Sequence, residues 1–347
     1  MRGRGGPGLF LMAFLALLTA FFSLSLGSGS PGPREVFLII LSKLPGLSSL
    51  VRPYWPPCYE VIVLEIRLPR VLLAALVGMA LACSGACLQG LFRNPLAGPY
   101  VLGLSSAAAF GACLSVLLGL GLYFGLFITP LLAFIMALAS LLLVYAIARI
   151  HGVLPTETLV LAGIVVGCFF SALVSLMLCL AGLKIYEMMG WLFGSFWAAS
   201  WRDVALAAPP ILASAAVVMA FSWELNAIYL GEEQALHVGV DVELLKHVLV
   251  AACSLMTAVS VSLTGIIGFV GLVVPHLARL LVGADHRVLL PASCLGGAML
   301  MVLADLVART AFRPVELPVG AITALLGVPL FAHLLRRRKA RWFGHEA

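Results

Sequence analysis

Apolar stretches follow one another along most of this 347-residue chain, and short polar connections separate them. Ten stretches have about the length that a helix needs to cross the hydrocarbon core of a bilayer. They cover residues 9–26, 71–91, 101–118, 122–147, 158–180, 204–221, 248–263, 266–282, 288–307 and 319–335. Backbone polar groups inside a bilayer must be satisfied within their own segment, so these stretches are expected to be helices. The pattern predicts an all-α polytopic membrane protein with about ten transmembrane helices and a single transmembrane domain over residues 1–347.

The composition agrees with this pattern, since 63% of the residues are hydrophobic and only 10% are charged. Soluble domains carry about a quarter charged residues. No charged residue occurs between Arg93 and Arg149, a stretch that must cross the bilayer twice with a turn near residues 119–125. The net charge of +6 is modest for this length, so no nucleic-acid partner is expected. The first stretch, 9–26, is longer than the apolar region of most cleaved signal peptides, which favours a membrane helix over that alternative.

The distribution of Lys and Arg predicts the orientation. With ten spans, both termini lie on one side of the membrane. Placing that side in the cytoplasm puts 12 of the 21 Lys and Arg residues inside, among them Arg2, Arg4 and the cluster from Arg336 to Arg341. Cytoplasmic loops normally carry the excess of these residues. The chain is therefore expected to be a multi-pass protein of the inner (plasma) membrane, in contact with lipid, with both termini in the cytoplasm.

One polar connection, about residues 222–247, has a helical pattern and lies on the predicted cytoplasmic side. Glu232 and Glu233 suit the first turn of a helix, because the helix dipole favours acidic side chains there. Ala235 and Val238 are expected to share a face, and Gly239 can end the helix in a left-handed conformation. A solvated loop helix and a docking element for another protein both fit this pattern.

The sequence offers no chemistry for an enzyme. A phosphate-binding loop needs a Gly-Lys-[Ser/Thr] ending, and no lysine of this chain follows a glycine, so ATP hydrolysis is expected in a separate subunit. No cofactor and no metal site are predicted, because His276 has no second ligand at a suitable spacing. Asp305 precedes Arg309 by four residues, which favours an ion pair over the proton-coupling role that an ion-driven carrier would require.

Two further patterns predict close packing. Gly265, Gly268 and Gly271 recur at three-residue spacing, which favours a surface against which another helix lies closely. The pairs Asn94-Pro95 and Gly98-Pro99 break the helix after the second span. Irregular backbone cannot face lipid, so this turn is expected to be packed within the protein.

Four segments, taken together, carry a resemblance to a known family. The first reads RLPR at 67–70 with RNPLAGP at 93–99, and the second reads GEEQALHVGV at 231–240. The third reads GIIGFVGLVVPH at 265–276 with DHR at 285–287, and the fourth reads ADLVAR at 304–309 with ELPVG at 316–320. In this order and spacing the chain resembles the permease subunits of the binding-protein-dependent ABC importers for iron-siderophores, haem and cobalamin. The resemblance implies the type II importer fold, with ten helices per subunit.

The resemblance also implies the partners and the cargo. The partners are a second copy of the chain, two cytoplasmic ATPase subunits and one periplasmic or extracellular substrate-binding protein. The expected cargo is a metal chelate, either an iron-siderophore or haem, and cobalamin is the alternative. An ion-coupled secondary transporter is the alternative from another class, in which Asp305 would be the coupling acid.

Three sets of site residues follow from the resemblance. The residues that match the ATPase-coupling helix are Gly231, Glu232, Glu233, Ala235, Val238 and Gly239. The residues that match the arginines receiving acidic groups of the binding protein are Arg67, Arg70 and Arg309, for which lipid contact or pairing with Asp305 is the alternative. The residues at the position of the cytoplasmic gate are Thr156 and Glu157. Glu157 replaces a small hydroxyl residue of the family pattern, and capping of the following helix by either side chain explains this pair equally well.

Overall fold

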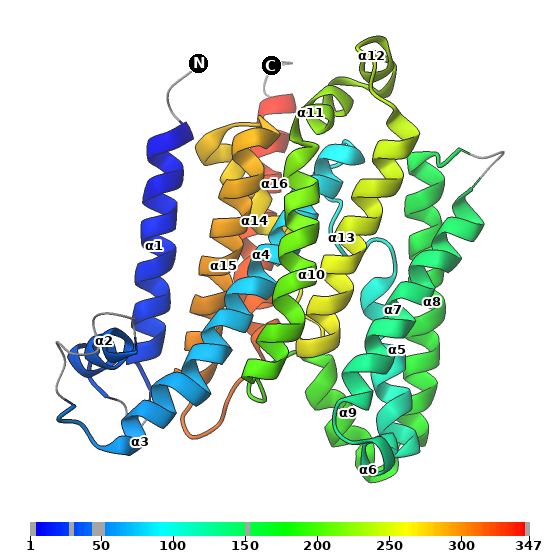
Figure 1. The fold of residues 1–347 in the computed structure, drawn as a ribbon. Helices are drawn as coiled ribbons and strands as arrows, with labels where there is room; N and C mark the ends of the chain where they lie inside the picture. Colours follow the sequence, from blue (N-terminus) through cyan, green and yellow to red (C-terminus); the bar gives the residue numbers. More distant parts are fainter. Residues whose placement is uncertain (1–4, 28–30, 44–52, 150–152, 344–347) are drawn as a thin grey trace.

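The protein is a bundle of helices, most of which run along one common direction (Figure 1). The computed structural model describes residues 5–27, 31–43, 53–149 and 153–343, and this part of the chain contains no strand. Seven helices in it are long and apolar enough to cross a membrane. They are α1 (Gly5–Ser25), the continuous helix from Pro57 to Leu91, α7 (Ile128–Ala148), α8 (Thr156–Leu180), α10 (Trp201–Ala220), α13 (Val242–Thr264) and α15 (His286–Thr310). Three shorter apolar helices lie among them: α5 (Leu104–Leu118), α14 (Val270–Val282) and the first part of α16 (Val319–Phe343).

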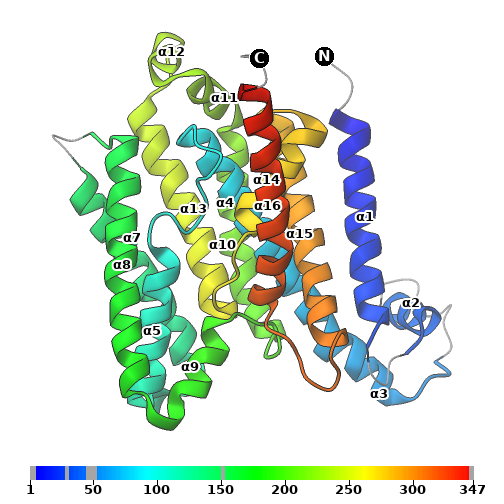
Figure 2. The same ribbon diagram turned by 180° about the vertical axis from the view of Figure 1, so that it is seen from behind.

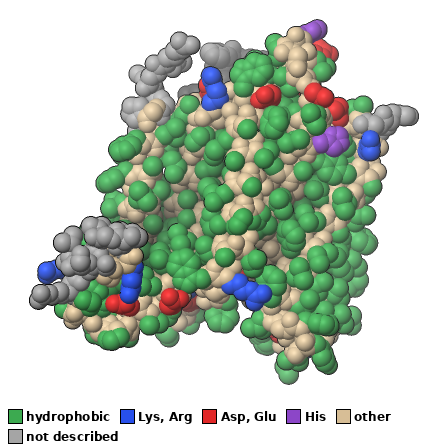
Figure 3. All heavy atoms as spheres, in the orientation of Figure 1, with side chains coloured by type: hydrophobic (Ala, Val, Ile, Leu, Met, Phe, Trp, Pro, Cys, Tyr) green, Lys and Arg blue, Asp and Glu red, His purple; other side chains and the backbone are tan. Residues whose placement is uncertain are grey.

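These ten helices coincide with the ten predicted stretches, so the predicted all-α polytopic fold is confirmed. Figure 3 shows hydrophobic side chains over the middle of one face, with the charged side chains near the two ends. A lipid-facing belt between two aqueous interfaces has this distribution. The turn predicted near residues 119–125 is also present, as the short helix α6 (Leu120–Phe124) between Gly119 and Gly125.

The predicted start of the second span was too late. The helix begins at Pro57 as α3 (Pro57–Glu60), passes through one π-helical segment (Val61–Arg67) and continues as α4 (Leu68–Leu91). Pro69 lies directly after the π-helical segment, where the backbone bonds already depart from the α-helical pattern, and the helix continues through it. Part of the connection between the first two predicted stretches is therefore helical, and α2 (Pro33–Ser42) lies in it as well.

Other spans also begin elsewhere than predicted, among them α7, which begins at Ile128 rather than near residue 122. Helix α13 begins at Val242 rather than near residue 248, because the Asp241 carboxylate accepts a hydrogen bond from the Leu244 N–H and caps the helix there. Helix α14 begins at Val270 rather than near residue 266, since Gly265 (φ 73°) and Phe269 (φ 66°) hold the preceding segment in a non-helical conformation.

Helix α1 begins and α16 finishes at the same end of the bundle, as Figures 1 and 2 show. This end, which also carries α11 (Ser222–Leu230) and α12 (Glu232–His237), is called the terminal end below. The opposite end, with α2, α3, α6 and α9 (Ile185–Leu192), is called the far end. Arg2 and Arg4, which contributed to the predicted orientation, lie outside the described residues.

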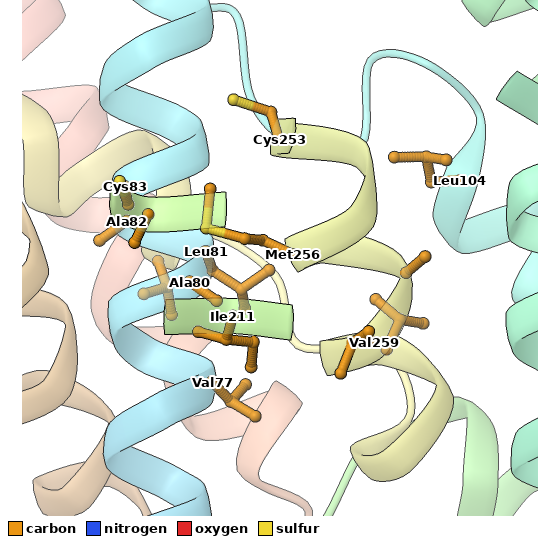
Figure 4. Packing of buried hydrophobic residues seen from close by; sticks show 14 of the residues in the cluster. Val77, Ala80, Leu81, Ala82, Cys83, Leu104, Ile211, Cys253, Met256 and Val259 are labelled. Carbon is orange, nitrogen blue, oxygen red and sulfur yellow. The ribbon is translucent and has the colours of Figure 1, made fainter. Parts of the chain in front are cut away.

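Helix α4 occupies the centre of the bundle and contacts α10, α13, α14 and α15. Figure 4 shows Val77, Ala80 and Leu81 of α4 near Ile211 of α10 and Met256 of α13. Small residues allow the helices to approach closely, as is usual where lipid supplies no hydrophobic driving force. Close packing of side chains, and not polar bonds alone, therefore holds the helices together in this centre.

The glycine prediction is right at two of its three positions. A Cβ on Gly271 would lie 2.5 Å from Pro99 Cδ, and one on Gly265 would lie 2.1 Å from the Trp191 carbonyl oxygen. A Cβ on Gly268 would have no atom within 4 Å. The segment before α14 is not helical, so the three-residue spacing does not place its glycines on one face. Pro99 is buried against Gly271, so the prediction that the turn after α4 is packed within the protein is confirmed for residues 97–99, whereas Asn94 and Leu96 are exposed.

Candidate functional site

Helix α12 projects from the terminal end of the bundle between α11 and α13 (Figure 1). Glu232 and Glu233 form its first turn, as predicted. Gly239 follows the helix with φ 85°, so the predicted left-handed end is confirmed. Ala235 is fully buried, which fixes one face of this short helix against the rest of the protein.

The prediction that Ala235 and Val238 share a face is wrong. The helix ends at His237, and Val238 lies one residue beyond it. Its side chain is 59% exposed, as is that of Leu236. Two apolar side chains therefore stand at the outer tip of α12, where a second protein can cover them.

A buried lysine connects α12 to the body of the bundle. Lys246 lies in the first part of α13 and is only 2% exposed. Its ammonium group lies 2.8 Å from Glu232 Oε2, 3.4 Å from Glu243 Oε1 and 3.3 Å from the Leu154 carbonyl oxygen. A buried charge is tolerated only when it is paired and hydrogen-bonded in this way. Lys246 and these partners are called the Lys246 cluster below.

Of the two predicted gate residues, only Thr156 contacts the Lys246 cluster. Thr156, the first residue of α8, donates a hydrogen bond from Oγ1 to Glu232 Oε1 at 3.2 Å. Glu157 is exposed in the first turn of α8. The capping alternative is wrong for both, because the cap is Pro155, which makes no side-chain bond, and both side chains follow it. The structure thus brings Thr156 to the predicted coupling helix and leaves Glu157 outside the cluster.

A second polar link joins α11 to α15. Asn226 Oδ1 accepts hydrogen bonds from the His286 backbone N–H at 2.8 Å and lies 2.7 Å from its Nδ1, while Asn226 Nδ2 donates to Asp285 at 2.8 Å. The Arg287 side chain donates from Nε and Nη2 to both oxygens of Asp285, and this pairing holds the pKa of the Asp285 carboxyl well below its usual value. The N-terminus of α15 is therefore tied to the same connection that carries α12.

At the far end, Arg70 is bound to two carboxylates. Its guanidinium lies 2.9 Å from Asp305 Oδ1, and it makes two bonds to Glu316 at 3.1 and 2.9 Å. Asp305 is 1% exposed, and its Oδ2 lies 3.6 Å from Arg309 Nε. The predicted ion pair of Asp305 is present, but Arg70 is the closer partner.

The other two arginines of the predicted docking set bind the end of α1. Arg67 donates to the Leu24 carbonyl oxygen at 2.7 Å. Arg309 donates to the carbonyl oxygens of Ser23 and Leu26 and to the Ser23 hydroxyl. Basic side chains commonly satisfy the last carbonyl groups of a helix in this way. The structure thus places all three arginines at the far end, largely covered by their own chain, with Arg70 and Arg309 beside the carboxylate of Asp305.

An open cavity of about 740 Å³ lies beside this arginine group. Its lining is rich in aromatic side chains and includes Glu316, the exposed partner of Arg70. The aromatic residues of the lining are Phe127, Trp191, Phe193, Phe196 and Trp197. Cavities of this size and chemistry hold drug-sized ligands in other proteins.

Sequence reasoning missed four residues of these two ends: Asn226, Glu243, Lys246 and Glu316. One signal was available for two of them, because Glu243 and Lys246 are three residues apart and pair along one helix. Lys246 is 92 residues from Leu154, and no local pattern predicts such a pair.

The comparisons with known proteins agree with this architecture. The model of the FecCD transport family matches residues 15–337. The chain is 47% identical over 287 residues to the cobalamin import system permease of Halobacterium salinarum, covering 82% of this chain and 76% of that protein. It is 38% identical to the hemin transport system permease of Yersinia pestis, covering 99% of this chain and all of that protein. A solved structure, described as a metal-chelate type ABC transporter in an inward-facing conformation, has a TM-score of 0.80 and 34% identity over 95% of this chain and 98% of that one.

The family match covers nearly the whole chain, and the helical architecture is shared with a solved transporter over almost the full length of both chains. The chain therefore belongs to the FecCD transport family, and it is a multi-pass membrane permease rather than an ATPase.

Proposed function

We propose that this chain is the permease of an ATP-driven importer and works as a homodimer with two ATPase subunits and one external binding protein. The observation that carries the proposal is α12, a short helix that projects from the bundle with exposed apolar residues at its tip and a bonded path to Thr156. An ATPase that seats on α12 would move it when the nucleotide sites close. The path to Thr156 gives this movement a direct route to the start of α8.

The terminal end is assigned to the cytoplasm in this proposal. The excess of Lys and Arg on that side of the predicted topology supports this orientation. The far end then faces the binding protein, and the aromatic cavity beside Glu316 lies on the side from which cargo would arrive.

The proposed cargo is a metal chelate, an iron-siderophore or haem, which fits the hemin permease among the relatives. Cobalamin is the second candidate, and the cobalamin permease among the relatives supports it. All three are large organic chelates, and the apolar part of the cavity lining offers contact surface to each of them.

The far-end arginines remain the proposed docking site for acidic groups of the binding protein. Arg67, Arg70 and Arg309 supply three positive charges, whereas Asp305 and Glu316 supply two negative ones. One net positive charge is left for an acidic partner. Lipid anchoring by the same arginines is the competing role.

An ion-coupled carrier finds little support. Asp305, the candidate for the coupling acid, is 1% exposed, and its carboxylate is already engaged by Arg70 and Arg309 of the same chain. This pairing is the structural role that the sequence favoured for Asp305 over proton coupling.

Uptake by vesicles tests the proposal. The permease is reconstituted with its ATPase subunits and binding protein, and import of haemin and cyanocobalamin is measured. We expect import to require ATP and to stop with vanadate, while proton and sodium ionophores leave it unchanged. Import by the permease alone, driven by an ion gradient and lost in Asp305→Asn, would support the carrier instead.

A further inference from the structure

Lys246 is unusual because it places an ammonium group inside a protein whose interior is apolar. It is 2% exposed, whereas its two carboxylate partners are partly open to solvent, with 39% of the Glu232 side chain and 36% of the Glu243 side chain exposed. A buried, charged lysine is stable only while its hydrogen-bond partners stay within bonding distance. The partners therefore define which parts of the protein must stay together.

The ammonium bridges two segments that are distant in sequence. Glu232 belongs to α12, and Leu154 belongs to the chain segment immediately before α8. Glu243, on the same helix as Lys246, accepts a hydrogen bond from the Leu154 N–H at 2.9 Å. Both the N–H and the carbonyl group of Leu154 are thus bound by side chains of α13.

Thr156 closes the arrangement. Its hydroxyl binds Glu232 Oε1, while Lys246 binds Glu232 Oε2. The two oxygens of one carboxylate thus bind the start of α8 and the first part of α13. If α12 moves relative to α13, it must take the segment 154–156 with it or leave a buried charge with fewer partners. Loss of one partner of a buried pair is strongly unfavourable. Joint movement of α12 and the segment 154–156 therefore costs less free energy than movement of α12 alone.

We infer that Lys246 is a positioning residue that couples displacement of α12 to displacement of the segment before α8. The inference rests on the proposed function, since coupling matters only if an ATPase acts on α12. It goes beyond that function because it assigns the connection to one ammonium group and its three acceptors, Glu232, Glu243 and the Leu154 carbonyl.

The first experiment measures coupling in the complete transporter. Lys246→Met keeps the length of the side chain and removes its charge, Lys246→Arg keeps the charge, and Glu232→Gln removes the charge on α12. Lys184→Met is the matched control, because Lys184 also donates to a backbone carbonyl, that of Leu117 at 2.9 Å, but is exposed. Import of haemin and cyanocobalamin and hydrolysis of ATP are measured together.

The number of molecules imported per ATP hydrolysed is the decisive quantity. We expect it to fall about tenfold in Lys246→Met, within the usual range of coupling between sites, and to recover in Lys246→Arg. A smaller fall is expected in Glu232→Gln and none in Lys184→Met. A purely structural role would lower import and hydrolysis in proportion, which leaves the ratio unchanged and overturns the inference.

The second experiment does not depend on transport. Spin labels at the exposed positions Gln234 and Val153 report the separation of α12 from the segment before α8 in the isolated permease. We expect the distribution of distances to broaden in Lys246→Met and to keep its width in Lys184→Met. An unchanged distribution overturns the inference, as does a broader one without a lower import ratio.

The two experiments separate the inference from the proposed function. If the wild-type complex shows no ATP-driven import, the proposed function fails, and the coupling role of Lys246 fails with it even where the labels show that Lys246 holds α12. If wild-type import is normal and the Lys246 variants match the control, only the inference is overturned.

Discussion

Two glycines show how strictly single residues are constrained in the centre of this bundle. A Cβ on Gly85 of α4 would lie 1.8 Å from the carbonyl oxygen of Gly271 on α14. Because the obstacle is backbone, no side-chain rotation relieves it, and the helices would have to separate. Gly268, in contrast, has open space around the same position and lies only three residues from Gly271.

We therefore expect Gly85→Ala to lower the free energy of unfolding by about 3 kcal/mol or more, since overpacking of a well-packed core has this cost. Gly268→Ala is the matched control and is expected to leave stability nearly unchanged. Thermal unfolding of the two purified variants in the same detergent compares them. Equal melting temperatures would contradict the close helix contact.

At the scale of elements, hydropathy alone predicted the number of apolar helices and their order. It succeeded because the bilayer imposes length and polarity on each span separately. It failed at helix ends, as at Val242 and Val270, where capping and positive φ values decide the boundary. It also could not find the pairing of Arg70 with Asp305, 235 residues away, since only the fold brings them together.

Helix α12 provides the prediction at this scale. Leu236 and Val238 are exposed at its tip, so Leu236→Glu and Val238→Glu add a charge to the proposed ATPase contact without disturbing the buried Ala235. We expect each variant to weaken binding of the ATPase by about 2 kcal/mol, as for truncation of a central interface residue. Titration of the permease with the purified ATPase subunit measures this affinity.

Leu183→Glu is the control for these two variants. Leu183 is 90% exposed and lies in the short 3₁₀ turn Gly182–Lys184 near the far end. Its substitution adds the same charge at a site remote from α12 and is expected to leave ATPase affinity unchanged. Equal affinities for all three variants would mean that the tip of α12 does not meet the ATPase.

At the scale of the whole molecule, α15 joins the two ends. It begins beside Asn226 of α11 at the terminal end, and it carries Asp305 and Arg309 at the far end. A shift of α11 that moved α15 along its axis would therefore change the surroundings of the far-end arginines. A single helix, α15, thus connects the charged residues at the two ends of the bundle.

The far-end charges give the last prediction. If Arg67, Arg70 and Arg309 receive acidic groups of the binding protein, each Arg→Glu variant should weaken docking by about 2 kcal/mol or more where the pair is desolvated. Higher salt should weaken docking of the wild type, because exposed charges are screened. Affinity is measured by surface-immobilised permease at low and high salt.

Glu316→Gln distinguishes docking from a purely internal role of these arginines. The Glu316 side chain is 44% exposed and binds Arg70 with both oxygens, so it competes with an acidic partner for the same guanidinium. Removing its charge should tighten docking if the arginines face the binding protein, and should only reduce stability if they anchor lipid or hold the end of α1. Unchanged docking of all three Arg→Glu variants at low salt, together with no gain in Glu316→Gln, would assign the arginines to the internal role, in which they satisfy the carbonyl groups of α1 and the buried Asp305.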